Sequence, residues 1–99
     1  MLCNDMDDTE TAAFMAKLGG DHWPACSYQE THWQIPTRAE VPVSYITCLQ
    51  DNILPVNWQQ TFAQRFHAGS TVSIDAGHQA MNTCPAELAA LLLYEASKF

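Results

Sequence analysis

The second half of the chain carries the pattern that most constrains the fold, because strand-like and helix-like runs alternate there. The runs VPVSYITCL (41–49) and STVSID (70–75) are rich in β-branched and aromatic residues, and the first is predicted to be buried on both faces. Residues 57–67 and 85–99 have apolar side chains at helical spacing. This order predicts an α/β fold in which two parallel strands are joined by a right-handed crossover.

The first forty residues are predicted to hold one helix followed by an irregular connection. The acidic run NDMDDTE is expected to be the solvated entrance of that helix, where Asp7 and Glu10 form a capping box. Gly19 and Gly20 are expected to end the helix in the left-handed conformation, which glycine adopts at little cost. Residues 21–40 lose all periodicity and are predicted to contain no more than one helical turn.

Capping residues also predict the limits of the two later helices. Asn57 with Gln60 is predicted to cap the crossover helix, and Gly69 is predicted to close it. Residues 76–84, AGHQAMNTC, are predicted to be a loop after the second strand. Pro85 then suits the first position of the last helix, where its missing N–H has no partner to lose.

The charge and the apolar content of the chain exclude several classes of partner. Four Lys and Arg residues face eleven Asp and Glu residues, which gives a net charge of −7. Nucleic acid and anionic membrane surfaces require clustered cations, so neither is expected as a partner. The longest apolar stretch, AELAALLLY, is too short to cross a bilayer. With no secretory leader at its start, the chain is expected to be cytoplasmic.

The cysteines and histidines do not predict a metal or cofactor site. The four cysteines are widely spaced and form no CxxC pair, so we expect free thiols. His22, Cys26 and His32 lie closer together, but their spacing fits no zinc pattern. We therefore expect no metal and no cofactor.

Two acid–base residues follow the two predicted strands. Asp51 comes shortly after the first strand and His78 shortly after the second. The carboxyl ends of neighbouring parallel strands lie at the same edge of a sheet, where α/β proteins place their chemistry. An aspartate beside an imidazole fixes its tautomer and stabilises the imidazolium that forms when the ring takes a proton. We therefore expect a catalytic pair, although each residue alone would also suit an ordinary turn or loop.

The segments around this pair resemble the C-terminal part of α/β-hydrolases, most nearly the small esterase group that includes plant methyl esterases and hydroxynitrile lyases. The features that carry the resemblance are the acidic residue and apolar-proline loop of DNILP, the pair Gly77-His78, the apolar Met81, and Pro85 at the start of a helix. The run CNDMDDTETAAFMAKL also resembles the part of the family's lid that returns toward the sheet. The family often has Arg-Pro after the lid helix, where this chain has Gly19-Gly20.

The resemblance implies a partial α/β-hydrolase fold, with the last two parallel strands, their flanking helices and the end of a lid region. Residues 1–40 would form the end of the lid or cap region and its connection to the sheet. Residues 41–99 would form the C-terminal strand-helix-strand-helix part of the core. By this similarity Asp51 carries the triad acid and His78 the triad base.

The family's serine nucleophile has no counterpart in this chain. It stands on a G-x-S-x-G elbow ahead of the triad acid, and no serine here has glycines two residues before and two residues after it. Cys3 and Cys26 precede Asp51, but neither has the strand-turn-helix context of a nucleophile. We therefore expect the C-terminal part of a longer hydrolase. Alone it should be nearly inactive, because removing a triad nucleophile lowers turnover by about 10⁶-fold.

The parent enzyme is expected to hydrolyse a small-molecule carboxylic ester. Hydroxynitrile lyases of the group place a lysine directly after the catalytic histidine, where this chain has Gln79, and this difference favours an esterase. Ile53, Leu54 and Met81 are candidates for the walls of an apolar substrate pocket, although ordinary packing of the loops would suit them equally.

A non-catalytic, hydrolase-like binding or interaction module is the alternative. The missing serine favours that alternative. The presence of both Asp51 and His78 favours the enzyme, because a binding protein has no chemical need for such a pair.

Two apolar parallel strands without further neighbours leave edges that pair with other chains, so we expect the isolated chain to self-associate. Sedimentation velocity of the purified chain should show oligomers or aggregates. A monomer with a sharp two-state melt would contradict this expectation.

Overall fold

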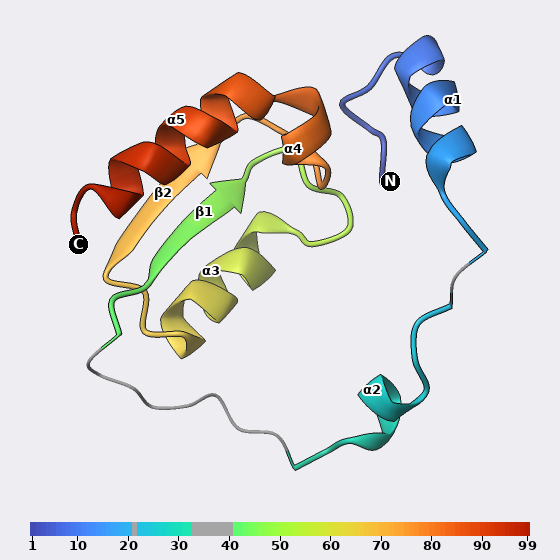
Figure 1. Ribbon diagram of the computed structural model, residues 1–99. Helices are drawn as coiled ribbons and strands as arrows, with labels where there is room; N and C mark the ends of the chain where they lie inside the picture. Colours follow the sequence, from blue (N-terminus) through green and yellow to red (C-terminus); the bar gives the residue numbers. More distant parts are fainter. Residues whose placement is uncertain (21, 33–40) are drawn as a thin grey trace.

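The computed structural model of the chain describes residues 1–20, 22–32 and 41–99 (Figure 1). Its elements, in chain order, are α1 (Asp8–Lys17), α2 (Cys26–Gln29), β1 (Ser44–Cys48), α3 (Val56–Arg65), β2 (Ser70–Ile74), α4 (Ala80–Thr83) and α5 (Pro85–Ala96). The predicted order of strand, helix, strand and helix is therefore confirmed. In the predicted irregular connection α2 is a helical turn, and residues 21 and 33–40 lie outside the described part.

The two strands form a parallel sheet, as predicted. Ser44 lies opposite Ser70 at one end of the register, and Cys48 lies opposite Ile74 at the other. The helix α3 packs against β1 and α5 packs against β2, and Figure 1 shows the two helices on opposite faces of the sheet. The described core is thus a three-layer α/β arrangement, in which helices cover a sheet of two strands.

The most buried apolar cluster lies between the end of β2 and α5. Its centre is formed by Ile74, Ala76 and Ala80, which are almost fully buried. Partly buried apolar residues pack around this centre, and they are Ile46, Cys48, Cys84, Leu88 and Leu91. The small side chains at the centre allow α4 and α5 to approach the sheet closely, and this approach fixes the segment that follows β2.

The prediction that the first strand is buried on both faces is wrong for the described residues. Within β1 only Thr47 is buried, while its neighbours are half-buried. In β2 the residues Thr71 and Ser73 are exposed, so that strand alternates between an inner and an outer face. The reason is that each face of the sheet is covered by a single helix, since α3 packs against β1 and α5 packs against β2 (Figure 1).

One side chain from α3 compensates for the missing neighbour of β1. Gln59 is only 2% exposed, and its amide group accepts from the Cys48 N–H at 2.8 Å and donates to the Cys48 carbonyl at 2.9 Å. It also donates to the Leu54 carbonyl at 2.7 Å. Gln59 therefore occupies, at Cys48, the place that another strand would fill, and it closes part of the open edge of β1.

The most buried residues of α3 are not its large apolar residues. The helix buries Gln59 and Ala63 against the sheet, whereas Trp58 and Phe66 are 58% and 46% exposed. A strong hydrogen-bonding requirement at Cys48 selects the face that carries Gln59. Trp58 and Phe66 are consequently left on the outer side, while Phe62 between them is half-buried.

The ends of α3 also differ from the prediction. The helix begins at Val56 after Pro55, without the side-chain cap predicted from Asn57 and Gln60. At its other end His67, rather than Gly69, adopts the left-handed conformation, with φ 55°. The N–H of Ala68 then donates to the carbonyl five residues earlier at 2.9 Å, which is the pattern of a Schellman end.

The predicted capping box of α1 is confirmed, but its predicted glycine end is not. Asp7 accepts from the Glu10 N–H at 2.7 Å, and Glu10 accepts from the Asp7 N–H at 3.1 Å. The helix ends at Lys17 with Leu18 in an extended conformation, and no described glycine is left-handed. The chain therefore leaves α1 by extending directly.

The segment after β2 is more ordered than the predicted loop. Residues 80–83 form the short helix α4, which is followed at once by α5 with Pro85 in its first turn, as predicted. Residues 75–79 alone form the loop that carries His78. The helix α4 therefore shortens the free part of this segment and anchors it against the core.

The amino end of β1 is tied to the end of α5 through a buried carboxylate. Glu95, 3% exposed, accepts from Ser44 Oγ at 2.7 Å and from Lys98 Nζ at 2.7 Å. Hydrogen bonds from Lys98, which has the larger effect, and from Ser44 lower the pKa of Glu95 from 4.5 to about 2. The carboxylate thus stays ionised throughout the neutral range and keeps this tie intact.

Among the helices in the described ranges, none has the length and apolarity that a bilayer crossing requires.

Replacing Gln59 by Ala should lower the free energy of unfolding by about 1–3 kcal/mol, because the backbone groups of Cys48 would lose their partners. Urea unfolding followed by circular dichroism measures this change. Gln60→Ala, at the exposed next position of the same helix, is the matched control and should change the free energy by less than about 0.5 kcal/mol. Equal effects of the two substitutions would show that Gln59 does not close the edge of β1.

Candidate active site

The candidate site lies at the carboxyl edge of the sheet, in the loops that leave β1 and β2. Backbone pairing continues past both strands, because Leu49 N–H donates to the Ile74 carbonyl and Gln50 N–H to the Ala76 carbonyl, each at 3.0 Å. The two loops therefore stay side by side as they leave the sheet. Asp51 lies in the first loop and His78 in the second.

The structure brings together the two residues that were expected to form a pair. Asp51 Oδ2 lies 2.8 Å from His78 Nδ1. The Asp51 side chain is 5% exposed, whereas the His78 side chain is 35% exposed. The carboxylate is therefore enclosed, whereas the ring is partly open to solvent.

Backbone amides of the loop that contains Asp51 donate hydrogen bonds to the other carboxylate oxygen of this residue. Asp51 Oδ1 accepts from the Ile53 N–H at 2.8 Å and from the Leu54 N–H at 2.9 Å. Burial raises the pKa of Asp51, but the hydrogen bonds from Leu54, His78 and Ile53 outweigh burial and hold that pKa below its ordinary value. Asp51 is consequently an ionised acceptor at neutral pH.

The charge on Asp51 determines the tautomer of His78. An ionised carboxylate can only accept, so the short contact requires the proton of the neutral ring to lie on Nδ1. The lone pair then lies on Nε2, which makes no hydrogen bond to any residue in the described ranges. Since the ring is partly exposed, its Nε2 atom is arranged to accept a proton from a group that approaches from outside.

Cys48, at the end of β1, is poorly suited to be that group. Burial raises the pKa of its thiol, and the negative charges of Asp51 and Asp5 raise it further. A thiol in such surroundings stays protonated, and the protonated form is a poor nucleophile.

The three residues predicted to line a substrate pocket lie near the pair, and their predicted role stays a prediction. Ile53 and Leu54 belong to the loop that holds Asp51, and Met81 lies in α4, three residues after His78. Ile53 is 40% exposed and Met81 is 58% exposed, while Leu54 is half-buried. Apolar side chains thus occur in both of the segments that carry the pair.

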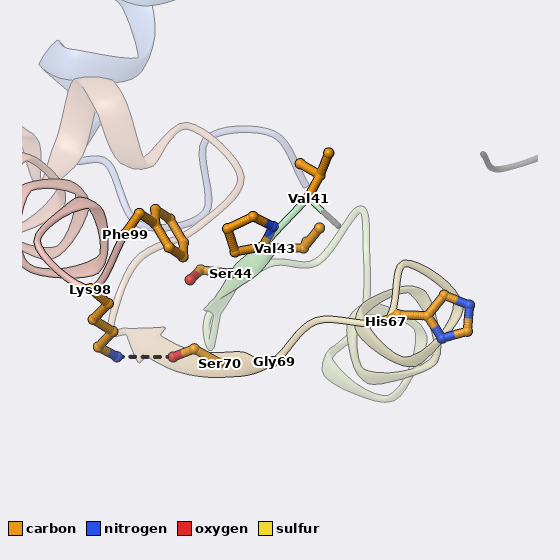
Figure 2. Close-up of a pocket in the computed structure, with 9 residues that line it drawn as sticks. Val41, Val43, Ser44, His67, Gly69, Ser70, Lys98 and Phe99 are labelled. Atoms are coloured by element: carbon orange, nitrogen blue, oxygen red, sulfur yellow. Dashed lines mark hydrogen bonds between the residues drawn. The ribbon is translucent and has the colours of Figure 1, made fainter. Parts of the chain in front are cut away.

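Two hollows in the surface lie away from this pair. One runs along α3 between Trp58 and Arg65. The other, shown in Figure 2, lies at the amino ends of the strands, where Lys98 Nζ donates to Ser70 Oγ at 3.0 Å. Ser44 and Ser70 line this second hollow, at the opposite end of the strands from His78.

No cluster of three or more His, Cys, Asp or Glu side chains that could hold a metal ion occurs within residues 1–20, 22–32 and 41–99.

Sequence reasoning missed two residues that reach this edge from the amino-terminal segment. The Asn4 side chain donates to the Gln50 carbonyl at 2.6 Å, and Asp5 Oδ2 accepts from the Gly77 N–H at 2.6 Å. The acidic run that contains Asp5 was expected to be solvated, but Asp5 is half-buried. Its neighbours in the chain carry no signal of this contact, because the partners lie far away in sequence.

Comparisons of the chain with models of protein families, with curated proteins and with solved structures gave no match.

Removing the ring of His78 should raise the pKa of Asp51, because burial would then act against fewer hydrogen bonds. A carboxyl group whose pKa is lowered by folding adds to the free energy of unfolding when the pH is above the pKa of the unfolded chain. The wild-type protein should therefore lose the contribution of Asp51 as the pH falls below 3.8. His78→Ala should lose a smaller amount of stability over the same pH range. Carboxyl ¹³C NMR titration measures the pKa. His22→Ala, at an exposed position, is the control, and an unchanged Asp51 pKa in His78→Ala would contradict the coupling.

Proposed function

We propose that Asp51 and His78 are the acid and the base of a Ser-His-Asp triad, and that the chain is the C-terminal part of an α/β-hydrolase that cleaves carboxylic esters. The serine belongs to sequence outside these 99 residues, since none of the serines present has the G-x-S-x-G pattern. In this proposal the parallel strands and their helices are a partial α/β-hydrolase fold, and residues 1–40 end its lid.

The observation that carries the proposal is the short contact between the enclosed Asp51 carboxylate and the half-exposed ring of His78. It joins loops from two neighbouring parallel strands, at the edge where α/β enzymes place their catalytic residues. The Nε2 atom of His78 makes no hydrogen bond to a described residue, so it is available to a serine hydroxyl.

The chemistry follows from the tautomer. His78 Nε2 takes the proton of the serine hydroxyl as the serine attacks the ester carbonyl, and Asp51 stabilises the imidazolium. His78 returns the proton to the leaving alcohol, which leaves an acyl-enzyme. The ring then takes a proton from water as the water oxygen attacks the acyl carbonyl. It returns this proton to the serine oxygen as the bond between the serine and the acyl group breaks and the carboxylic acid leaves.

The substrate in this proposal is a small ester with an apolar acyl or alcohol group. Ile53, Leu54 and Met81 are the residues that would contact it, since each lies within three positions of Asp51 or His78 in the chain. Gln79, directly after the base, is an uncharged residue and favours ester hydrolysis over cyanide release, which lysine supports in the related lyases.

A fluorophosphonate probe should not label the purified 99-residue chain, because its nucleophile is absent. Strong labelling would overturn that part of the proposal.

In a longer protein that joins this chain to an upstream G-x-S-x-G segment, His78→Ala should lower esterase turnover by about 10⁶-fold. His22→Ala is the matched control and should leave turnover unchanged. Near-normal turnover in His78→Ala would remove His78 from the triad.

A further inference from the structure

We propose that Asn4 and Asp5 form a clasp that positions the Asp51–His78 pair from outside its two loops. The two side chains are adjacent in the chain and reach different loops. This inference rests on the proposed function in one respect, which is the catalytic role given to Asp51 and His78. The contacts that define the clasp are independent of that role.

The Asp5 arm holds both ends of the segment that carries His78. Its Oδ2 atom accepts from the Gly77 N–H at 2.6 Å and from Thr83 Oγ1 at 2.8 Å. Gly77 directly precedes His78, and Thr83 is the last residue of α4. A single carboxylate oxygen therefore fixes the entry and the exit of the segment between them.

The Asn4 arm holds the loop that leads to Asp51. Asn4 Nδ2 donates to the carbonyl of Gln50, the residue directly before Asp51, at 2.6 Å. The Gln50 side chain in turn donates to Asp75 Oδ1 at 2.9 Å. The clasp thus ends one residue before each member of the pair, and Gln50 also joins the two loops directly.

Gly77 is required by the close approach of Asp5 rather than by its own backbone. Its φ lies outside the left-handed region, so another residue could adopt this conformation. A Cβ atom at this position, however, would lie 2.5 Å from Asp5 Oδ1. The glycine before His78 therefore makes room for the clasp.

The carboxylate of Asp5 makes both of its hydrogen bonds through Oδ2. Its Oδ1 atom is buried and makes none within the described part of the chain. What Asp5 contributes to this edge of the sheet is therefore the fixed position of the Gly77 N–H, and thereby of the His78 backbone.

The test is the tautomer of His78 in the 99-residue chain, read from ring ¹⁵N–¹H correlation spectra at about pH 8. Wild type should show the Nδ1–H form alone. Asp5→Ala should lose this single-tautomer pattern and show a mixture, because His78 is no longer held opposite Asp51. Asp5→Asn should restore the wild-type pattern, since one amide oxygen can accept both hydrogen bonds.

Asp8→Ala is the matched control, because it removes the same charge from an exposed position of α1 and should leave the spectrum unchanged. A wild-type pattern in Asp5→Ala, or an Asp5→Asn spectrum as altered as that of Asp5→Ala, would overturn the clasp. If circular dichroism shows that Asp5→Ala is unfolded, Gly77→Ala replaces it, because its Cβ atom would displace the Asp5 carboxylate. The same tautomer mixture is expected, and a wild-type spectrum would overturn the clasp.

This measurement needs no catalysis, so it separates the clasp from the proposed function. A longer protein without esterase activity would overturn the function and leave an altered tautomer in Asp5→Ala as support for the clasp. Conversely, an active esterase whose Asp5→Ala variant keeps the Nδ1–H form would overturn the clasp alone.

Discussion

The parallel pairing of β1 with β2 is the constraint on which the rest of the structure depends. Its register sets Cys48 opposite Ile74, so both strands end at the same level. Asp51 follows the end of β1 by three residues and His78 follows the end of β2 by four residues. The pairing of the strands thus allows Asp51 Oδ2 and His78 Nδ1 to lie 2.8 Å apart. A shift of the register by one residue would turn the side chains of one strand to the opposite face and break this alignment.

The enclosed charge of Asp51 connects the fold of its loop with the chemistry of the pair. A carboxylate removed from water must be hydrogen-bonded, and here two amides of its own loop and one ring supply the donors. The same bonds keep the pKa low enough for the carboxylate to accept from Nδ1. Loop conformation, ionisation and ring tautomer are therefore one arrangement, and the loss of any part weakens the others.

Much of the local structure could be predicted because it depends on neighbours in the chain. The capping box of Asp7 and Glu10, the first-turn position of Pro85 and the order of strands and helices are of this kind. The inner face of α3 could not be predicted from its spacing. The backbone groups of Cys48 find their partners in the Gln59 side chain, and the spacing of apolar residues contains no information about that contact.

The sequence alone was sufficient to indicate two parallel strands and to single out an acid and a base at one edge of their sheet. The order of strands and helices along the chain, and the point where each strand ends, can be read from local patterns. The tertiary structure alone decided what holds that edge. Asn4 meets Gln50 across 46 positions, and Asp5 meets Gly77 across 72. Contacts over such separations arise only when the sheet and α4 have brought distant segments together, so no local pattern marks Asp5 as different from the solvated acids beside it.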